Sequence, residues 1–180
     1  MIPTERELRD GFFAGSAPDR GLYGRRRIEF TVIGLPEPKG STRSFAFHAK
    51  DKYTGQPMYV NGKPVLRAAT TSDNPKLKDW QHAVASGAHR ALEQVPEPER
   101  ALLVGPVAID VVFELPRPKS APKSRTAHTT RPDLDKLLRA VKDALTNVLW
   151  RDDGQVTEIR ARKRYAEMQQ HPRVFVAVEG

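Results

Sequence analysis

The stretch that decides the fold is 131-RPDLDKLLRAVKDALTNVLWRDDGQVTEIRARKRY-165. Its first half repeats apolar residues at helical spacing, which predicts an amphipathic helix with one side facing a core. Its second half begins with Asp152-Asp153-Gly154, a turn signal, and then alternates well enough to predict a strand. The apolar residues of the helix are Leu134, Leu137, Leu138, Val141, Leu145 and Val148.

Four acids bracket this helix, although the chain as a whole has a net charge of +8. Two lie in its first turn, where a carboxylate is favourable beside unpaired N–H groups, and two lie in the turn that follows it. Carboxylate oxygens are also the ligands that Mg²⁺ takes, with water and substrate phosphate oxygens, in metal-assisted phosphodiester hydrolysis. The spacing alone therefore leaves both helix capping and metal binding open for Asp133, Asp135, Asp152 and Asp153.

The Arg-x-Asp-x-Asp sequence at the start of the stretch and the Asp-Asp-x-Gln-Val sequence near its end resemble the signature of the RusA family of Holliday junction resolvases. The resemblance implies a RusA-like fold and a nuclease site built on this helix. The matching positions are Arg131, Asp133, Asp135, Leu137, Asp143-Ala144-Leu145, Trp150, Asp152-Asp153 and Gln155-Val156.

The resemblance also assigns roles to single residues. The family's functional lysine falls on Arg139, and an asparagine that is frequent after the second acid is replaced by Lys136. A guanidinium does not deprotonate in proteins, so Arg139 can neutralise phosphate charge but cannot act as a general base. The implied cofactor is Mg²⁺, with Mn²⁺ as a substitute. The implied metal ligands are Asp133, Asp135 and Asp153, with Asp152 assisting.

Length and composition fit a single basic domain. A chain of 180 residues suits one domain. Residues 1–27 mix charges and glycines without a period, which predicts a loosely ordered extension before the RusA-like domain at residues 28–180. The 30 Lys and Arg against 22 Asp and Glu favour a polyanionic partner.

The absence of cysteine excludes disulfides and cysteine-ligated zinc and fits a reducing cytoplasm. No apolar run has the length of a membrane span, and the N-terminus lacks a signal-peptide pattern, so we expect a cytoplasmic protein without membrane contact. Lys39-Gly40-Ser41-Thr42-Arg43 does not have the order of a nucleotide-binding loop. No nucleotide cofactor is therefore expected.

The remaining pattern predicts an α/β (α+β) domain in which two main helices pack on a mixed sheet. A second helix is expected from Asp73 or Asn74 to Val95, with Trp80 in its apolar stripe. We expect His48 to lie at the surface, and His82 and His89 to face solvent or to be satisfied by local hydrogen bonds. Strands are expected at 28–32, 107–115 (central), 157–165 and 173–179, and a small β-meander at 45–48, 57–60 and 65–67.

Two groups of cations are candidates for DNA contact. The loop at residues 116–131 contains no acid and leads into the acid cluster, so we expect it to hold phosphates. The alternation after the turn predicts a strand with one strongly cationic face. The expected DNA-binding residues are Lys119, Lys123, Arg125, Arg131, Lys136, Arg160 and Arg162.

Together these features predict a Mg²⁺-dependent, structure-specific endodeoxyribonuclease. With the family resemblance, its expected activity is the resolution of four-way junctions by paired hydrolysis in DNA recombination and repair, with Asp133, Asp135, Asp153 and Arg139 as catalytic residues. Two equivalent cuts call for two equivalent sites, which a homodimer supplies. Two alternatives stay open: a Mg²⁺-dependent nuclease for other branched or flapped DNA, and a non-catalytic DNA-binding protein of the same fold.

The acids must also meet in space. A helix from Asp135 to Val148 is about 20 Å long, which separates its first acids from the turn after it. The five residues from Val148 to Asp153, run extended, cover at most about 17 Å, so the chain can fold back along the helix. Because Leu149 and Trp150 are apolar and can pack on that helix, we expect each site within one chain. The alternative is a site shared between subunits.

Overall fold

The structure is a computed structural model that describes residues 26–180, apart from residues 41, 73, 123 and 168. The predicted extension thus lies outside the described residues, except for Arg26 and Arg27. None of the helices in the described part of the chain is long and apolar enough to cross a membrane.

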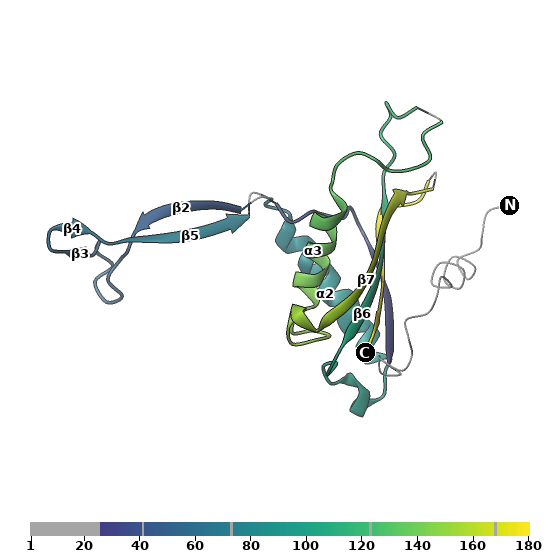
Figure 1. Cartoon of the computed structure of the whole chain (residues 1–180), viewed down its shortest axis with the longest axis horizontal. Coiled ribbons are helices and arrows are strands. Elements are labelled where there is room, and N and C mark those ends of the chain that lie inside the picture. The colour runs from purple at the N-terminus through teal and green to yellow at the C-terminus, as the bar shows by residue number, and fades with distance from the viewer. Residues whose placement is uncertain (1–25, 41, 73, 123, 168) are drawn as a thin grey trace.

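The body of the molecule is a four-stranded mixed sheet (Figure 1). Its strands are β1 (Arg27–Ile33), β6 (Val107–Leu115), β7 (Val156–Tyr165) and β8 (Arg173–Glu179), in the order β1-β8-β6-β7. β8 is antiparallel to β1 and β6, whereas β7 is parallel to β6. The predicted strand at 107–115 is therefore confirmed as an inner strand.

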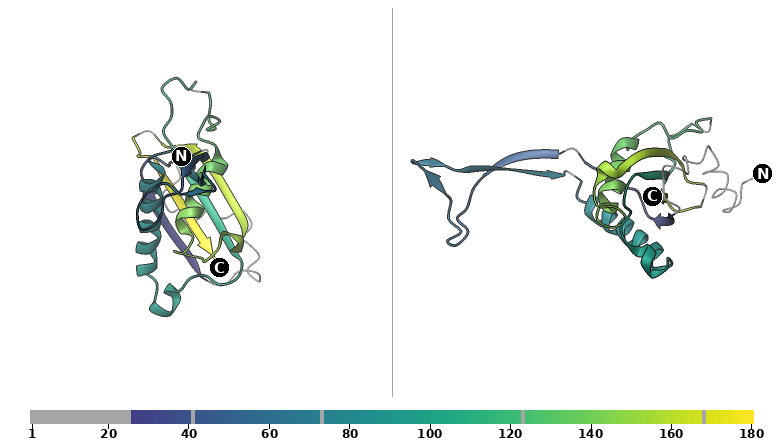
Figure 2. Two further views of the ribbon diagram at one scale, coloured as in Figure 1. Left: turned by 90° about the vertical axis from the view of Figure 1, so that its left-hand side faces the viewer. Right: turned by 60° about the horizontal axis from the view of Figure 1, so that its bottom comes forward.

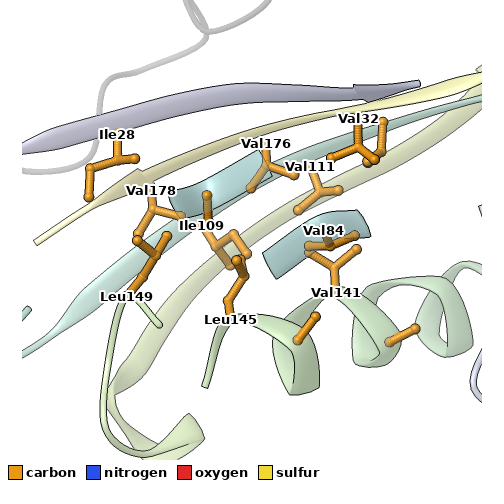
Figure 3. Packing of buried hydrophobic residues seen from close by; sticks show 14 of the residues in the cluster. Ile28, Val32, Val84, Ile109, Val111, Val141, Leu145, Leu149, Val176 and Val178 are labelled. Atoms are coloured by element: carbon orange, nitrogen blue, oxygen red, sulfur yellow. The ribbon is translucent and has the colours of Figure 1, made fainter. Parts of the chain in front are cut away.

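Two helices cover one face of this sheet. They are α2 (Leu77–Glu93) and α3 (Leu134–Leu145), and their apolar stripes close the core against alternate residues of the strands. Figure 3 shows Val84 of α2 and Val141 of α3 next to each other, on the side of the sheet that carries Ile109 and Val111 of β6. Trp80 is 5% exposed, and the imidazoles of His82 and His89 are exposed, as expected. The predicted α+β class with two main helices on a mixed sheet is confirmed.

One glycine sets how closely α2 crosses the sheet. A Cβ atom at Gly87 would lie 2.9 Å from side-chain carbons of both Phe30 and Val32 on β1. Larger side chains at this position of α2 would therefore push the helix off the sheet.

Residues 42–72 form an arm that projects from the body (Figures 1 and 2). β2 (Thr42–His48) pairs antiparallel with β5 (Leu66–Ser72), and β3 (Tyr59–Val60) with β4 (Lys63–Pro64) at the tip. The predicted three-strand meander is wrong, because β2 skips the short strands and pairs with β5. The predicted turns at Gly55 and Gly62, both at positive φ, lie inside the tip of the arm. His48 lies on the arm and is exposed, as expected.

Short helical turns connect these elements. η1 (Glu97–Arg100) follows α2, and η2 (Asp153–Gln155) links α3 to β7. The sharp turn around η2 lies at one end of α3, and the long loop after β6 lies at the other. The motif residues of the sequence are thus distributed over both ends of one helix.

Candidate nuclease site

The first pair of acids lies at the N-terminal end of α3. Asp133 is the N-cap residue, with an extended backbone, yet its side chain makes no capping hydrogen bond. Its carboxylate is 52% exposed, with the ammonium of Lys136 3.8 Å away. Asp135 follows in the first turn and is exposed. The capping interpretation therefore does not hold for the Asp133 side chain, whose oxygens are accessible to a metal ion.

A lysine of β7 fixes this end of α3. The Lys163 ammonium donates to the carbonyl oxygens of Thr130 and Pro132, each at 2.8 Å. These carbonyls belong to two of the three residues that directly precede Asp133. The strand thus sets where the helix begins, a role that sequence reasoning missed because it depends on how the sheet meets a distant loop.

An open cleft of about 610 Å³ lies beside Asp133. Its walls are mainly prolines and leucines, from the β1–β2 connection and from the loop after β6. Its polar lining comprises Glu37, His128, Arg131, Asp133 and Lys136. Sequence reasoning assigned no role to Glu37 or His128, and neither lies in a motif.

Both of these additional groups are held by the fold. The Asn74 side chain donates to the Glu37 carboxylate at 3.0 Å. His128 is 6% exposed, and its ring centroid lies 4.9 Å from that of Tyr165. Its buried Nδ1 has no hydrogen-bond partner among the described residues. Burial, and then the charge of Lys163, lowers the pKa of His128. The imidazole is therefore neutral at pH 7 and adds no positive charge to the cleft.

The third acid lies at the opposite end of α3. One carboxylate oxygen of Asp153 accepts from the Thr146 hydroxyl at 2.7 Å and from the Trp150 indole N–H at 3.2 Å, and the other lies 3.7 Å from the Lys142 ammonium. Burial alone would raise the pKa of Asp153, but these hydrogen bonds and the lysine charge outweigh it and lower the pKa. Asp153 is therefore ionised and fixed in orientation.

The neighbouring motif residues are structural. Asp152 caps η2 by accepting from the N–H of Gly154 at 2.6 Å, so the capping interpretation applies to it. The Gln155 side chain accepts from the N–H groups of Arg151 and Asp152, and donates to the carbonyl oxygens of Leu103 and Gly105. Together these bonds tie the turn to the segment before β6 and hold Asp153 in place.

The expected within-chain site is wrong for this fold. Asp133 and Thr146 occupy the N-cap and C-cap positions of α3, and at 1.5 Å per residue they lie about 20 Å apart. Asp153 is hydrogen-bonded to Thr146 and therefore lies at the far end of the helix from Asp133. Among the described residues, no three Asp, Glu, His or Cys side chains lie close enough to hold one metal ion. The chain does not fold back along the helix, because Leu149 and Trp150 are buried in the core at its C-terminal end.

Most of the predicted cations lie at the N-terminal end of α3. Arg139 is exposed one helical turn after Asp135, on the same side of the helix. The loop at 116–131 extends beyond the end of β6, next to the start of α3 (Figure 1). Its Lys119, Arg125 and Arg131 side chains are exposed, whereas Lys123 lies outside the described residues.

The cationic strand face that the sequence predicts is largely neutralised. Arg160 lies 3.8 Å from Asp110 and bonds Glu158 at 2.9 Å. Arg164 and Arg173 both bond Glu114, which is 1% exposed, at 2.6 Å. These side chains alternate with the core residues of β6 and β7 and so lie on the sheet face away from the helices. Arg160 therefore forms ion pairs within the sheet, while Arg162 is exposed on this same face.

Comparisons with known proteins identify one family that the chain resembles over most of its length. The family model for endodeoxyribonuclease RusA matches residues 52–179. An uncharacterized protein named YqaN from Bacillus subtilis (strain 168) is 32% identical over 169 residues, which cover 84% of this chain and 94% of that protein. The family match spans α2, α3 and the three strands β6, β7 and β8, and so includes both ends of the candidate site.

Proposed function

Because the chain belongs to the RusA endodeoxyribonuclease family, we propose that it is a Mg²⁺-dependent nuclease that resolves four-way DNA junctions. The observation that carries the proposal is at the N-terminal end of α3. The N-cap residue there is an aspartate whose carboxylate makes no capping hydrogen bond to the helix, and it follows a loop that contains no acid. A structural role for Asp133 would be expected to engage that side chain in the cap. DNA recombination and repair are the processes that such an activity serves.

Each residue has a defined task in this proposal. Asp133 and Asp135 would hold the metal ion, which supplies an activated water and neutralises charge on the phosphate. Arg139 and Lys136 would neutralise the charge of the phosphate oxygens. Arg139 cannot act as a general base, because a guanidinium does not deprotonate in proteins. The cations of the loop at 116–131 hold the DNA backbone on either side of the cut.

The distance between the acids favours a site shared by two chains. Asp153 is ionised and oriented but lies a full helix length from Asp133 and Asp135. A two-fold axis across the middle of α3 would bring the N-terminal end of each helix to the C-terminal end of the other. Two equal sites would result, each with two acids from one subunit and Asp153 from its partner, as two symmetric cuts require.

Cleavage assays with labelled four-way junction, flap and linear duplex test this function in the presence of Mg²⁺, Mn²⁺ or EDTA. We expect paired nicks in the junction with either metal ion and none in EDTA. Asp133→Asn and Asp153→Asn should each abolish cleavage and leave junction binding intact or tighter, because a negative charge beside phosphate is removed. Glu97→Gln, at an exposed position of η1, is the matched control.

Other outcomes distinguish the alternatives. Cutting of flaps in place of junctions would make the protein a nuclease for other branched DNA. Tight junction binding without cleavage by the parent protein would make it a non-catalytic DNA-binding member of the family. Parental rates in both Asp variants would overturn the assignment of these acids.

A further inference from the structure

The arm formed by residues 42–72 has no part in the site described so far, yet it begins next to it. The backbone N–H of Lys39 donates to the carbonyl oxygen of Lys136 on α3 at 3.0 Å, and the Lys39 ammonium pairs with Asp143 of the same helix. At the other end of the arm, the Asn74 side chain donates to Glu37 and to the carbonyl oxygen of Pro38, each at 3.0 Å. Both ends of the arm are thus fixed to the wall of the cleft that contains Asp133.

The arm carries an unusual combination of exposed side chains. Phe45 and Phe47 lie on one face of β2, 51% and 43% exposed, with ring centroids 6.2 Å apart. Arg67 lies directly opposite Phe47 on β5. Tyr53 and Tyr59 are exposed nearer the tip. A folded domain does not need this apolar surface, since its core is closed by α2 and α3.

The charge of the arm is almost entirely positive. Residues 42–72 contain five Lys and Arg residues and a single acid, Asp51. That carboxylate is engaged by its own turn, where it accepts from the N–H groups of Tyr53 and Thr54, and these bonds lower its pKa. Lys50, Lys52 and Lys63 are exposed around this turn and the tip.

Charge decides which partner fits this surface. A second copy of the chain also has a net charge of +8, so packing a basic arm on it would bring like charges together. A polyanion with flat apolar groups matches both features, because lysines contact phosphates and aromatic rings stack on bases. A two-stranded β-ribbon also has the width that the major groove of B-DNA admits.

We propose that the arm is a DNA-binding ribbon that holds the branched substrate beside the cut: Lys50 and Lys63 contact phosphates, and Phe45 and Phe47 stack on bases exposed at the branch point. This inference rests on the proposed function. It adds a contact region that extends away from the acids, so that affinity for the junction and cleavage chemistry depend on different parts of the chain.

The electrostatic half of the proposal is tested with Lys50→Gln/Lys63→Gln. Binding of a four-way junction is measured in EDTA over a range of salt concentrations, so that no cleavage interferes. The slope of log K against log salt should fall by up to about 1.8, since each lost phosphate contact removes about 0.9. Lys78→Gln/Arg90→Gln, which removes two exposed cations from α2, is the matched control and should leave the slope unchanged.

The stacking half is tested with Phe45→Ser/Phe47→Ser. This variant should bind the junction at least about fivefold more weakly, the lower end for the loss of one stacked base, with a smaller change for linear duplex. Sedimentation of the free protein should give the parental oligomeric state. A change of oligomeric state would overturn the proposal, because it would show that the arm packs on a second copy of the chain.

The loop variant Lys119→Gln/Arg125→Gln separates this inference from the proposed function. If the loop variant lowers the salt slope and both arm variants bind as the parent does, the arm does not bind DNA and the proposed function stands. If the parent protein does not bind the junction at all, the proposed function fails, and the inference fails with it. Loss of binding in the arm variants, with α2 controls unaffected, supports the assignment.

Discussion

Aspartates lie at both ends of α3, but their side chains are exposed at one end and held by hydrogen bonds at the other. At the N-terminal end, Asp133 occupies the N-cap without using its side chain, and Asp135 is exposed. At the C-terminal end, Asp153 is held by two hydrogen bonds and a lysine. The first end offers oxygens whose positions a metal ion can still adjust, whereas the second offers an oxygen that is oriented before any metal binds. In the proposed shared site, each end would therefore supply part of the metal ligands.

The largest effect is expected when the two halves are combined from different chains. Asp133→Asn and Asp153→Asn should each be inactive alone. Mixed under conditions of subunit exchange, they should recover nicking of one strand of the junction, because half of the shared sites in a mixed dimer regain all their acids. Nicking is followed on junctions labelled in one strand at a time.

A second mixture controls for recovery by simple dilution or stabilisation. Asp133→Asn mixed with Asp135→Asn removes two acids from the same end of α3, so no site in a mixed dimer of these variants is complete. Recovery in this mixture, or none in the first, would contradict the shared site.

The next effect concerns how Asp153 is oriented. Thr146→Val removes the hydroxyl that donates to Asp153 at 2.7 Å. The loss of such a supporting bond to a metal ligand is expected to cost about 10- to 100-fold in metal affinity or activity. It should also move the acid limb of the pH–activity profile to higher pH, because one of the bonds that lowers the pKa of Asp153 is gone. Thr146→Ser keeps the donor and should keep the parental profile.

The lowered pKa of Asp153 also determines how the stability of the protein changes with pH. The folded-state pKa of Asp153 is lowered, so its contribution to the free energy of unfolding is present above the unfolded pKa and is lost as the pH falls through the folded pKa. Thr146→Val should therefore reduce stability at neutral pH and reduce the dependence of stability on acid pH. Urea unfolding at several acid pH values measures both quantities.

The sequence predicted those parts of the molecule that depend on local periodicity. The stripes of α2 and α3 and the alternation of β6 could be read directly, because burial of one face imposes them. The resemblance also located both groups of acids. The helix was predicted to reach Val148, but α3 ends at Leu145, after which the chain turns with Asn147 at positive φ. The separation that this helix puts between Asp135 and the next acids was predicted. The predicted return of the chain along α3 is wrong, because Leu149 and Trp150 are buried in the core and do not pack along the helix.

Pairing over long distances could not be read from the sequence. β2 pairs with β5 across an insertion that looks, residue by residue, like a meander. The arginines of β7 look free in the sequence, yet Arg160 and Arg164 face Asp110 and Glu114 of β6 through the register of parallel strands. In the sequence, Lys163 is one of several cations of β7. Its role in fixing the loop before α3 becomes visible only in the structure, where its ammonium donates to the carbonyl oxygens of Thr130 and Pro132.

A smaller effect is expected from loosening the N-terminal end. Lys163→Met removes the donor that fixes the carbonyl oxygens of Thr130 and Pro132. Because each bond to a charged donor is worth about 1.5–3 kcal/mol and this group is partly exposed, we expect a loss in stability near the lower value. Cleavage should weaken most at low Mg²⁺ and recover as Mg²⁺ is raised, since the carboxylates themselves remain. Lys78→Met, which removes an exposed cation from α2, is the control. Equal loss of cleavage at all Mg²⁺ concentrations in Lys163→Met would contradict a positioning role.

The smallest effect is expected from His128, which lines the cleft beside Asp133 at the N-terminal end of α3. Burial and the charge of Lys163 lower its pKa in the folded state, so the unfolded chain binds a proton that the folded protein resists. Stability should therefore fall as the pH drops through the ordinary histidine range, with a slope that one proton limits to about 1.4 kcal/mol per pH unit. His128→Phe keeps a ring beside Tyr165 and removes the buried Nδ1, for which the described part of the chain offers no partner. This variant should flatten the dependence of stability on pH. His82→Gln, which removes an exposed imidazole from α2, is the matched control. Unfolding in urea between pH 5 and about 8 measures the difference. A parental slope in His128→Phe would show that folding does not lower the pKa of this imidazole.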